Sequence, residues 1–84
     1  MYKVEFSNSA KKDLEKVSSI YLVPVSSHIK NLSENPRPFG SAKLAGSKNH
    51  YRIRVGVYRI IYSIKENILV VEVIKIDHRR NVYR

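Results

Sequence analysis

The stretch "YRIRVGVYRIIY", residues 51–62, contains three arginines and no acidic residue. A β-hairpin does not require Arg52, Arg54 and Arg59 for folding, because like charges that are neighbours on one sheet surface repel each other. Each guanidinium presents a fixed fork of donors that matches the oxygens of a phosphate. The alternative is that they are solvated edge charges that prevent aggregation, a task that lysine performs equally well. We therefore interpret the three arginines as a phosphate-binding set.

The C-terminal segment "DHRRNVYR" carries further residues with usable chemistry: His78, Arg79, Arg80 and Tyr83. A lone histidine is more often structural than catalytic, but His78 adjoins two arginines and imidazole titrates near neutral pH. Tyr83 has three open interpretations, which are a core aromatic residue, a platform on which a base stacks, and a proton donor. His28 falls in a predicted helix, where we expect a surface role.

Two strands joined at Gly56 must position the arginines. Within residues 51–55, alternation places Arg52 and Arg54 on one face. Within residues 57–64 it places Arg59 on the face opposite Tyr58, Ile60, Tyr62 and Ile64. If these strands pair as a hairpin, the tyrosines and isoleucines face the helices and the three arginines share the open face.

A third strand is predicted at residues 68–76, "ILVVEVIKI". Its residues are almost all apolar on both faces of the strand. This pattern is typical of a central strand that is covered on both faces. Residues 77–84 are then either a short edge strand or an irregular tail. The preceding loop, residues 37–50, brings Lys43 and Lys48 next to the first strand of the hairpin, with Leu44 as its expected anchor in the core.

The N-terminal half predicts one strand and two helices. Residues 2–7 alternate as a strand, and Ser7 or Asn8 can cap a helix that runs to about Val17. We expect the second helix to begin near Pro24, since proline is tolerated in a first turn, and to end near Glu34. The order β-α-α-β-β-β predicts a single α+β domain, residues 1–84, with both helices on one face of a small, mainly antiparallel sheet of four to five strands.

Charge separates the two halves of the chain. The net charge is +9, with 6 − 4 = +2 in residues 1–40 and 10 − 3 = +7 in residues 41–84. The excess lies in the half predicted to form the sheet, and such a field favours a polyanion, most commonly nucleic acid. A merely soluble basic protein is the alternative.

Several classes of site are disfavoured by the composition. The seven acidic residues are scattered, so no carboxylate cluster for a catalytic metal is evident, and there is no cysteine for a disulfide or a thiolate site. We find no phosphate-binding glycine loop and no serine nucleophile motif. No apolar run approaches the roughly 20 residues of a membrane span, and the N-terminus is not typical of a signal peptide. We expect a cytoplasmic protein without metal or cofactor.

Two segments together resemble a known family: "KLAGSKNHYRIRVGVYRIIYSI" and "VVEVIKIDHRRNVYR". They are similar to the RelE/ParE toxin superfamily, and most similar to RelE-like ribosome-dependent endoribonucleases. The shared pattern is a leucine and a glycine before a Tyr-x-Ile strand, then Gly-x-Tyr-Arg-x-x-Tyr, then a terminal His-Arg-x-x-Val-Tyr. The resemblance covers almost the whole chain, and its C-terminal half is the more specific part.

The resemblance implies a toxin that cleaves mRNA on the ribosome and is held inactive by a cognate antitoxin in a hetero-oligomer. It implies that Arg59 stabilises the transition state, that Arg52 and Arg54 are the paired basic residues, and that Arg79 and Tyr83 complete the site. His78 stands where some relatives use a histidine. We further expect basic side chains around the site to bind the RNA backbone, namely Lys43, Lys48, Arg80 and Arg84.

Two departures from the family pattern keep other functions open. Relatives often carry lysine where Arg52 or Arg54 stands, and arginine stays protonated, so the general base is not identified. Val57 replaces an aspartate that is common before the Tyr-Arg pair. The alternatives are a ParE-like gyrase poison and a catalytically weakened toxin homologue that binds RNA.

Overall fold

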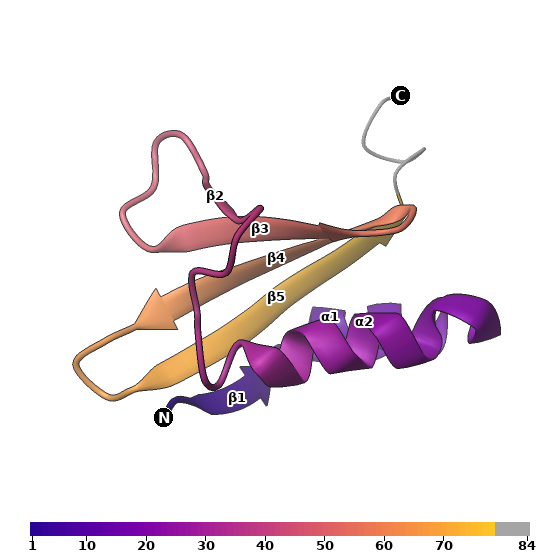
Figure 1. Cartoon of the computed structure of the whole chain (residues 1–84), viewed down its shortest axis with the longest axis horizontal. Helices are drawn as coiled ribbons and strands as arrows, with labels where there is room; N and C mark the ends of the chain where they lie inside the picture. The colour runs from indigo at the N-terminus through magenta and orange to yellow at the C-terminus, as the bar shows by residue number, and fades with distance from the viewer. Residues whose placement is uncertain (79–84) are drawn as a thin grey trace.

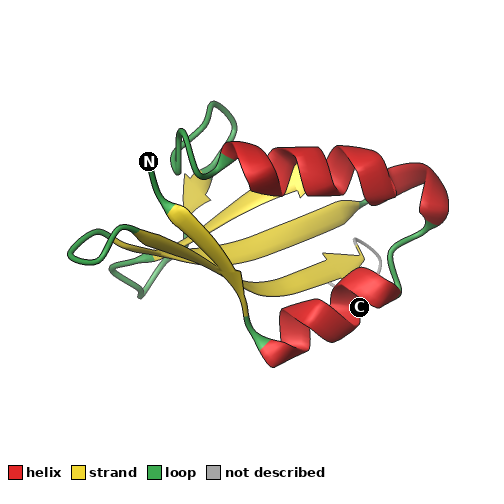
Figure 2. Cartoon of the chain, turned by 90° about the horizontal axis from the view of Figure 1, so that it is seen from below, coloured by secondary structure: helices red, strands yellow, loops and turns green. Residues whose placement is uncertain are grey.

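The computed structural model describes residues 1–78 and shows both helices packed on one face of a five-stranded sheet (Figure 1, Figure 2). The elements are β1 (Lys3–Phe6), α1 (Asn8–Glu15), α2 (Ser19–Asn31), β2 (Ala42–Lys43), β3 (His50–Val55), β4 (Tyr58–Lys65) and β5 (Val70–His78). The predicted α+β fold is confirmed. The predicted order lacked one strand, because β2 lies inside the segment that was expected to be a loop.

The sheet has the order β1-β5-β4-β3-β2, and only the β1–β5 pair is parallel. The apolar third strand of the prediction is β5, and it does lie inside the sheet, between β1 and β4. The expectation that both of its faces are covered is wrong, since the helices lie on one side (Figure 2) and Glu72 and Lys75 remain only half-buried. Val71 and Val73 are fully buried beneath the helices.

The serine at the start of α1 connects this helix to β5. The Ser7 hydroxyl accepts a hydrogen bond from the Ala10 amide at 3.0 Å, which caps the helix, and donates one to the Ile74 carbonyl at 2.8 Å. Ala10 and Val17 are buried, as the helical spacing predicts, although the helix itself ends at Glu15.

The second helix begins five residues earlier than the position of its proline suggests. It starts at Ser19 and ends at Asn31, so the predicted start at Pro24 and end at Glu34 are both wrong. Pro24 removes a hydrogen bond to the Ile20 carbonyl, but Ile20 is highly exposed, so water can satisfy that group. The exposed His28 bonds the Pro24 carbonyl through Nδ1 at 2.8 Å, in agreement with a surface role.

One extra residue in β5 changes which side chains face the helices. Ile61 pairs with Lys75 and Tyr62 with Val73, so Ile74 is bulged out of the ladder. Val73 and Ile76 are therefore both buried on the helix side, although strict alternation would place them on opposite faces. After the bulge, the residues of β5 face the opposite sides from those that strict alternation predicts. The bulge therefore determines which β5 side chain lies beside the arginines.

Candidate active site

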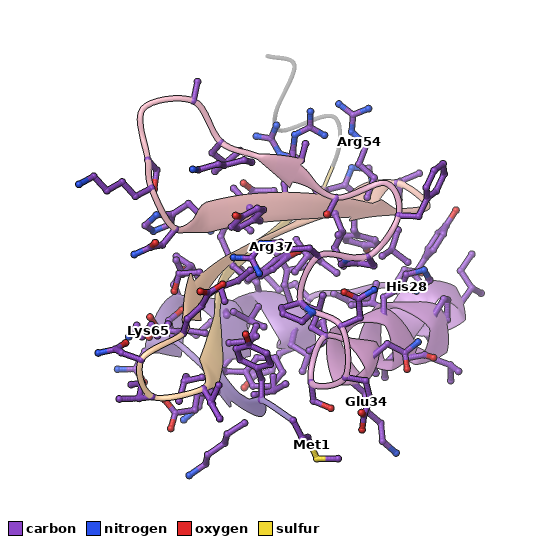
Figure 3. All side chains as sticks on the ribbon, turned by 60° about the vertical axis from the view of Figure 1, so that its left-hand side comes forward. Met1, His28, Glu34, Arg37, Arg54 and Lys65 are labelled. Atoms are coloured by element: carbon purple, nitrogen blue, oxygen red, sulfur yellow. The ribbon has the colours of Figure 1, made fainter. Side chains whose placement is uncertain are left out.

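The three arginines of the hairpin lie on the sheet face that the helices leave open. The β3–β4 register pairs Arg54 with Arg59 and Arg52 with Ile61, while Ile53 and Ile60 pair on the buried face. Directly paired residues share a face, so the predicted arginine face is confirmed. Arg54 is exposed and points away from the helix layer (Figure 3), whereas Arg52 and Arg59 are half-buried. We call Arg52, Arg54 and Arg59 the arginine face.

Arg59 is the central residue of this face, and one of its hydrogen-bond donors has no acceptor within residues 1–78. It lies on β4, with Arg54 of β3 on one side and Asp77 of β5 on the other. Its Nε is shielded from solvent and has no hydrogen-bond partner within residues 1–78. A buried donor without a partner costs free energy, so folding alone does not account for this arginine. An acceptor from a ligand, such as a phosphate oxygen, would remove the penalty.

Asp77 is a candidate site residue that the sequence interpretation left in the tail. It is the Cα partner of Arg59, and its Oδ1 lies 3.7 Å from the Lys75 Nζ. Lys75 is held more closely by Asp13 of α1, whose two carboxylate oxygens lie 3.2 and 3.3 Å from Nζ. Alternation alone could not have placed Asp77 on this face, because the bulge at Ile74 interrupts the pattern along β5.

His78 stands on the other side of the sheet from the arginine face. It pairs with Tyr58, and the two rings meet edge-on with centroids 5.3 Å apart. Its side chain borders a polar cavity of about 350 Å³ whose charged lining also includes Asp13, Lys16, Lys75 and Asp77. The structure therefore does not bring the imidazole together with Arg52, Arg54 and Arg59. A catalytic role for His78 stays a prediction that this geometry does not favour.

The other predicted site residues fall into two groups. Lys43 pairs with Tyr51 across β2 and β3, so the register places it on the face opposite Arg52, and Lys48 is exposed in the loop before β3. The remaining four lie outside the described residues: Arg79, Arg80, Tyr83 and Arg84. The chain leaves β5 at His78, whose partner Tyr58 adjoins the Gly56 turn, so it leaves the sheet at the Arg54–Arg59 end.

A fourth arginine, in the segment after α2, has three kinds of partner. Arg37 donates from Nε to the Tyr51 hydroxyl at 3.1 Å, forms an ion pair with Glu66 and lies over the Tyr51 ring. The hydrogen bonds to Tyr51 and Glu66 raise the pKa of Arg37. Tyr51 stacks on Tyr62, whose hydroxyl donates to the Pro36 carbonyl at 2.7 Å. We call Arg37, Tyr51, Tyr62 and Glu66 the Arg37 cluster; in Figure 3, Arg37 lies below β3 and Arg54 above it.

Residues 1–78 contain no group of three or more histidine and acidic side chains that could hold a metal ion. No helix within the same residues is long and apolar enough to cross a membrane.

Comparison with known proteins places these features in a family. The family model for the ParE toxin of type II toxin–antitoxin systems, parDE, matches residues 4–83. Toxin RelG of Mycobacterium tuberculosis is 32% identical over 87 residues, covering 99% of this chain and 97% of that protein. The isolated E. coli RelE toxin superposes with a TM-score of 0.83 at 28% identity, covering 99% of this chain and 92% of that one. The archaeal RelE of the RelE–RelB complex from Pyrococcus horikoshii gives 0.82 at 28% identity, covering 93% and 94%.

Proposed function

Because the chain belongs to the ParE toxin family of type II toxin–antitoxin systems, we propose that it is a toxin that cleaves ribosome-bound mRNA without a metal ion. The observation that carries the proposal is Arg59, a half-buried arginine in the middle of the arginine face whose shielded Nε has no partner among residues 1–78. Arg52 and Arg54 beside it can contact the neighbouring phosphates of a single strand. The charge of +9 supports binding to a polyanion.

The reaction that fits this face is attack by the 2′-hydroxyl of the RNA on its own adjacent phosphate. The 2′-oxygen forms a bond to phosphorus, the bond to the 5′-oxygen of the next nucleotide breaks, and the products are a 2′,3′-cyclic phosphate and a 5′-hydroxyl. Negative charge builds on the non-bridging oxygens in between. Arg59 donates to those oxygens, and fixed donors of this kind are among the largest contributions to catalysis.

Two proton transfers complete the reaction: the 2′-hydroxyl loses a proton and the leaving 5′-oxygen gains one. The arginines of the face stay protonated, so they are poor acceptors for the first transfer. Tyr83 and Arg79 are our candidates for the second, as the family resemblance implies. Weak acid–base groups suffice if the ribosome holds the RNA aligned, because orientation alone can supply about 7–11 kcal/mol of the barrier.

The test is cleavage of mRNA on purified, programmed ribosomes. Wild-type protein should give codon-phased fragments that end in a cyclic phosphate, and Arg59→Ala should slow cleavage by about 100- to 1,000-fold. Lys12→Ala is the matched control, since Lys12 is an exposed cation of α1 in the helix layer and should leave the rate unchanged. Intact mRNA with the wild-type protein would refute the proposal.

The name of the matching family favours one second candidate. ParE-type toxins suggest a gyrase target, for which the partner is a protein and the arginine face is not catalytic. Expression in growing cells separates the two functions, since a gyrase poison would induce the DNA-damage response while mRNA ends stay unchanged. Arg59→Ala should abolish growth arrest only if the toxin acts on mRNA.

We also propose a cognate antitoxin as the partner of this chain. The archaeal relative has been crystallised as a RelE–RelB complex, and here an acidic, partly disordered segment could neutralise the +7 half of the molecule. Co-expression with the neighbouring gene should yield a complex that withstands purification. Recovery of the toxin alone from such cells would count against a cognate partner.

A further inference from the structure

One row across the sheet joins three charged residues: Arg54 on β3, Arg59 on β4 and Asp77 on β5. Directly paired residues on one face have Cβ atoms about 4.5–5.5 Å apart, which is within reach of an arginine–carboxylate contact. Asp77 stands in this row because the bulge at Ile74 turns the end of β5 over. A carboxylate on a face that binds RNA repels the phosphates, so its presence there calls for a separate reason.

Asp77 borders the polar cavity that Lys75 and His78 also line, and the one ion pair it makes there within residues 1–78 is long. The Asp77 side chain is 25% exposed, and its one ion pair within residues 1–78, to the Lys75 ammonium, spans 3.7 Å. Lys75 does not depend on it, because Asp13 holds the same ammonium at 3.2 Å. A rotation of the Asp77 side chain from Lys75 toward β4 therefore leaves Lys75 paired, and it supplies the acceptor that Arg59 Nε lacks within residues 1–78.

We propose that Asp77 is the positioning residue for Arg59: when a phosphate binds, Asp77 accepts hydrogen bonds from the Arg59 Nε and one Nη, and the remaining Nη donors face the phosphate. This inference rests on the proposed ribonuclease function. Pairing one edge of the guanidinium with a carboxylate fixes its plane, since both partners are planar and bidentate. Asp77 would thus act through Arg59 and would not itself touch the RNA.

The first experiment compares Asp77→Asn with wild type in single-turnover cleavage of ribosome-bound mRNA. A misplaced guanidinium should slow the cleavage step by about 100-fold, while the Kd for the programmed ribosome stays constant or falls, because a negative charge has been removed. Glu72→Gln is the matched control, since Glu72 is a carboxylate of the same strand that pairs with Lys65 at 3.4 Å. Equal rates for Asp77→Asn and wild type would overturn the proposal.

The second experiment asks whether Asp77 acts through Arg59. In an Arg59→Lys background, which has no guanidinium to orient, Asp77→Asn should cause no further loss of rate. If Asp77 itself took the proton from the 2′-hydroxyl, Asp77→Asn would slow cleavage by the same factor in the Arg59→Lys background as in the wild type. Such additive losses of rate would overturn a positioning role. Thermal unfolding of each variant identifies any loss that comes from misfolding.

The third experiment separates failure of this inference from failure of the proposed function. A 2′-O-methyl oligonucleotide cannot be cleaved, and the Arg59 Nε–H resonance can be followed by ¹⁵N NMR as this RNA is added. The resonance should move downfield and become protected from exchange in the wild type but not in Asp77→Asn. If the wild type binds the RNA but never cleaves mRNA, the proposed ribonuclease function fails. The resonance still shows whether Asp77 pairs with Arg59 when RNA binds. If the resonance shifts and is protected equally in the wild type and in Asp77→Asn, the proposed pairing of Asp77 with Arg59 is overturned.

Discussion

Two arginine sites on opposite faces of the sheet differ in how far the protein's own acceptors satisfy the guanidinium. In the Arg37 cluster the guanidinium is exposed yet fully engaged by a hydroxyl, a carboxylate and an aromatic ring. Arg59 is half-buried, and its Nε is shielded from solvent without a partner within residues 1–78. Arg37 is thus engaged by acceptors of its own chain, whereas Arg59 keeps a buried donor without one, which is the pattern we expect of an arginine that acts on a ligand.

The largest expected effect comes from removing the guanidinium of Arg59 while keeping its alkyl stem. Arg59→Met should slow mRNA cleavage by about 100- to 1,000-fold. The free energy of unfolding should stay constant or rise by up to about 1 kcal/mol, because an unpartnered buried donor is lost. Single-turnover cleavage and urea denaturation on the same preparation test both halves. A clear loss of stability would show that Arg59 serves the fold, and the contrast with Arg37 would disappear.

The sequence predicted the arginine face correctly because both strands of the hairpin alternate without interruption. In β3 and β4 every second residue is apolar, so the period alone determines which side Arg52, Arg54 and Arg59 occupy. The end of β5 could not be predicted in this way. The bulge at Ile74 offsets the alternation of β5 side chains between the two faces by one residue. Asp77 therefore lies on the arginine face, and His78 packs against Tyr58. Bulges depend on tertiary contacts, here the hydrogen bond from Ser7 to the Ile74 carbonyl.

Two other differences have local physical causes. The start of α2 was placed at Pro24 on the rule that proline favours a first turn, but an exposed carbonyl at Ile20 makes the cost of an interior proline smaller. The strand β2 has two residues and no alternation to detect, since its pairing with β3 arises only when the loop folds back. The roles of Arg79 and Tyr83 stay predictions from the family resemblance.

A mutation in the turn between β3 and β4 tests whether the arginine face depends on its scaffold. Gly56 has φ +59°, and a Cβ there would lie 2.2 Å from Cε1 of the Tyr21 ring. Gly56→Ala should therefore destabilise the fold by about 2 kcal/mol or more, from left-handed strain and overpacking. Urea denaturation measures the loss. The double variant with Tyr21→Ala should recover only the part due to the clash, and full recovery would show that backbone strain contributes nothing.

Removing one hydroxyl tests the buried side of the Arg37 cluster. Tyr62→Phe should cost about 1–2 kcal/mol near neutral pH, because the Pro36 carbonyl loses its donor. Burial raises the pKa of Tyr62 to about 12 from its ordinary value of 10.0. Between these values the unfolded state releases the proton and the folded state retains it, so stability from this group is present below pH 10 and is lost as the pH rises toward 12. The advantage of wild type over Tyr62→Phe should shrink across that range, and a constant difference in urea denaturation would contradict this.

The smallest effect should come from Arg37, although it makes the greater number of visible contacts. Arg37→Met removes an exposed ion pair and a cation–π contact, which together contribute about 1 kcal/mol, and cleavage should stay at the wild-type rate. High salt should reduce the difference in unfolding free energy, because Arg37 and Glu66 are both solvent-accessible. If Arg37→Met instead slowed cleavage as strongly as Arg59→Met, the number of acceptors around an arginine would not distinguish the two roles, and both faces of the sheet would have to contact the RNA.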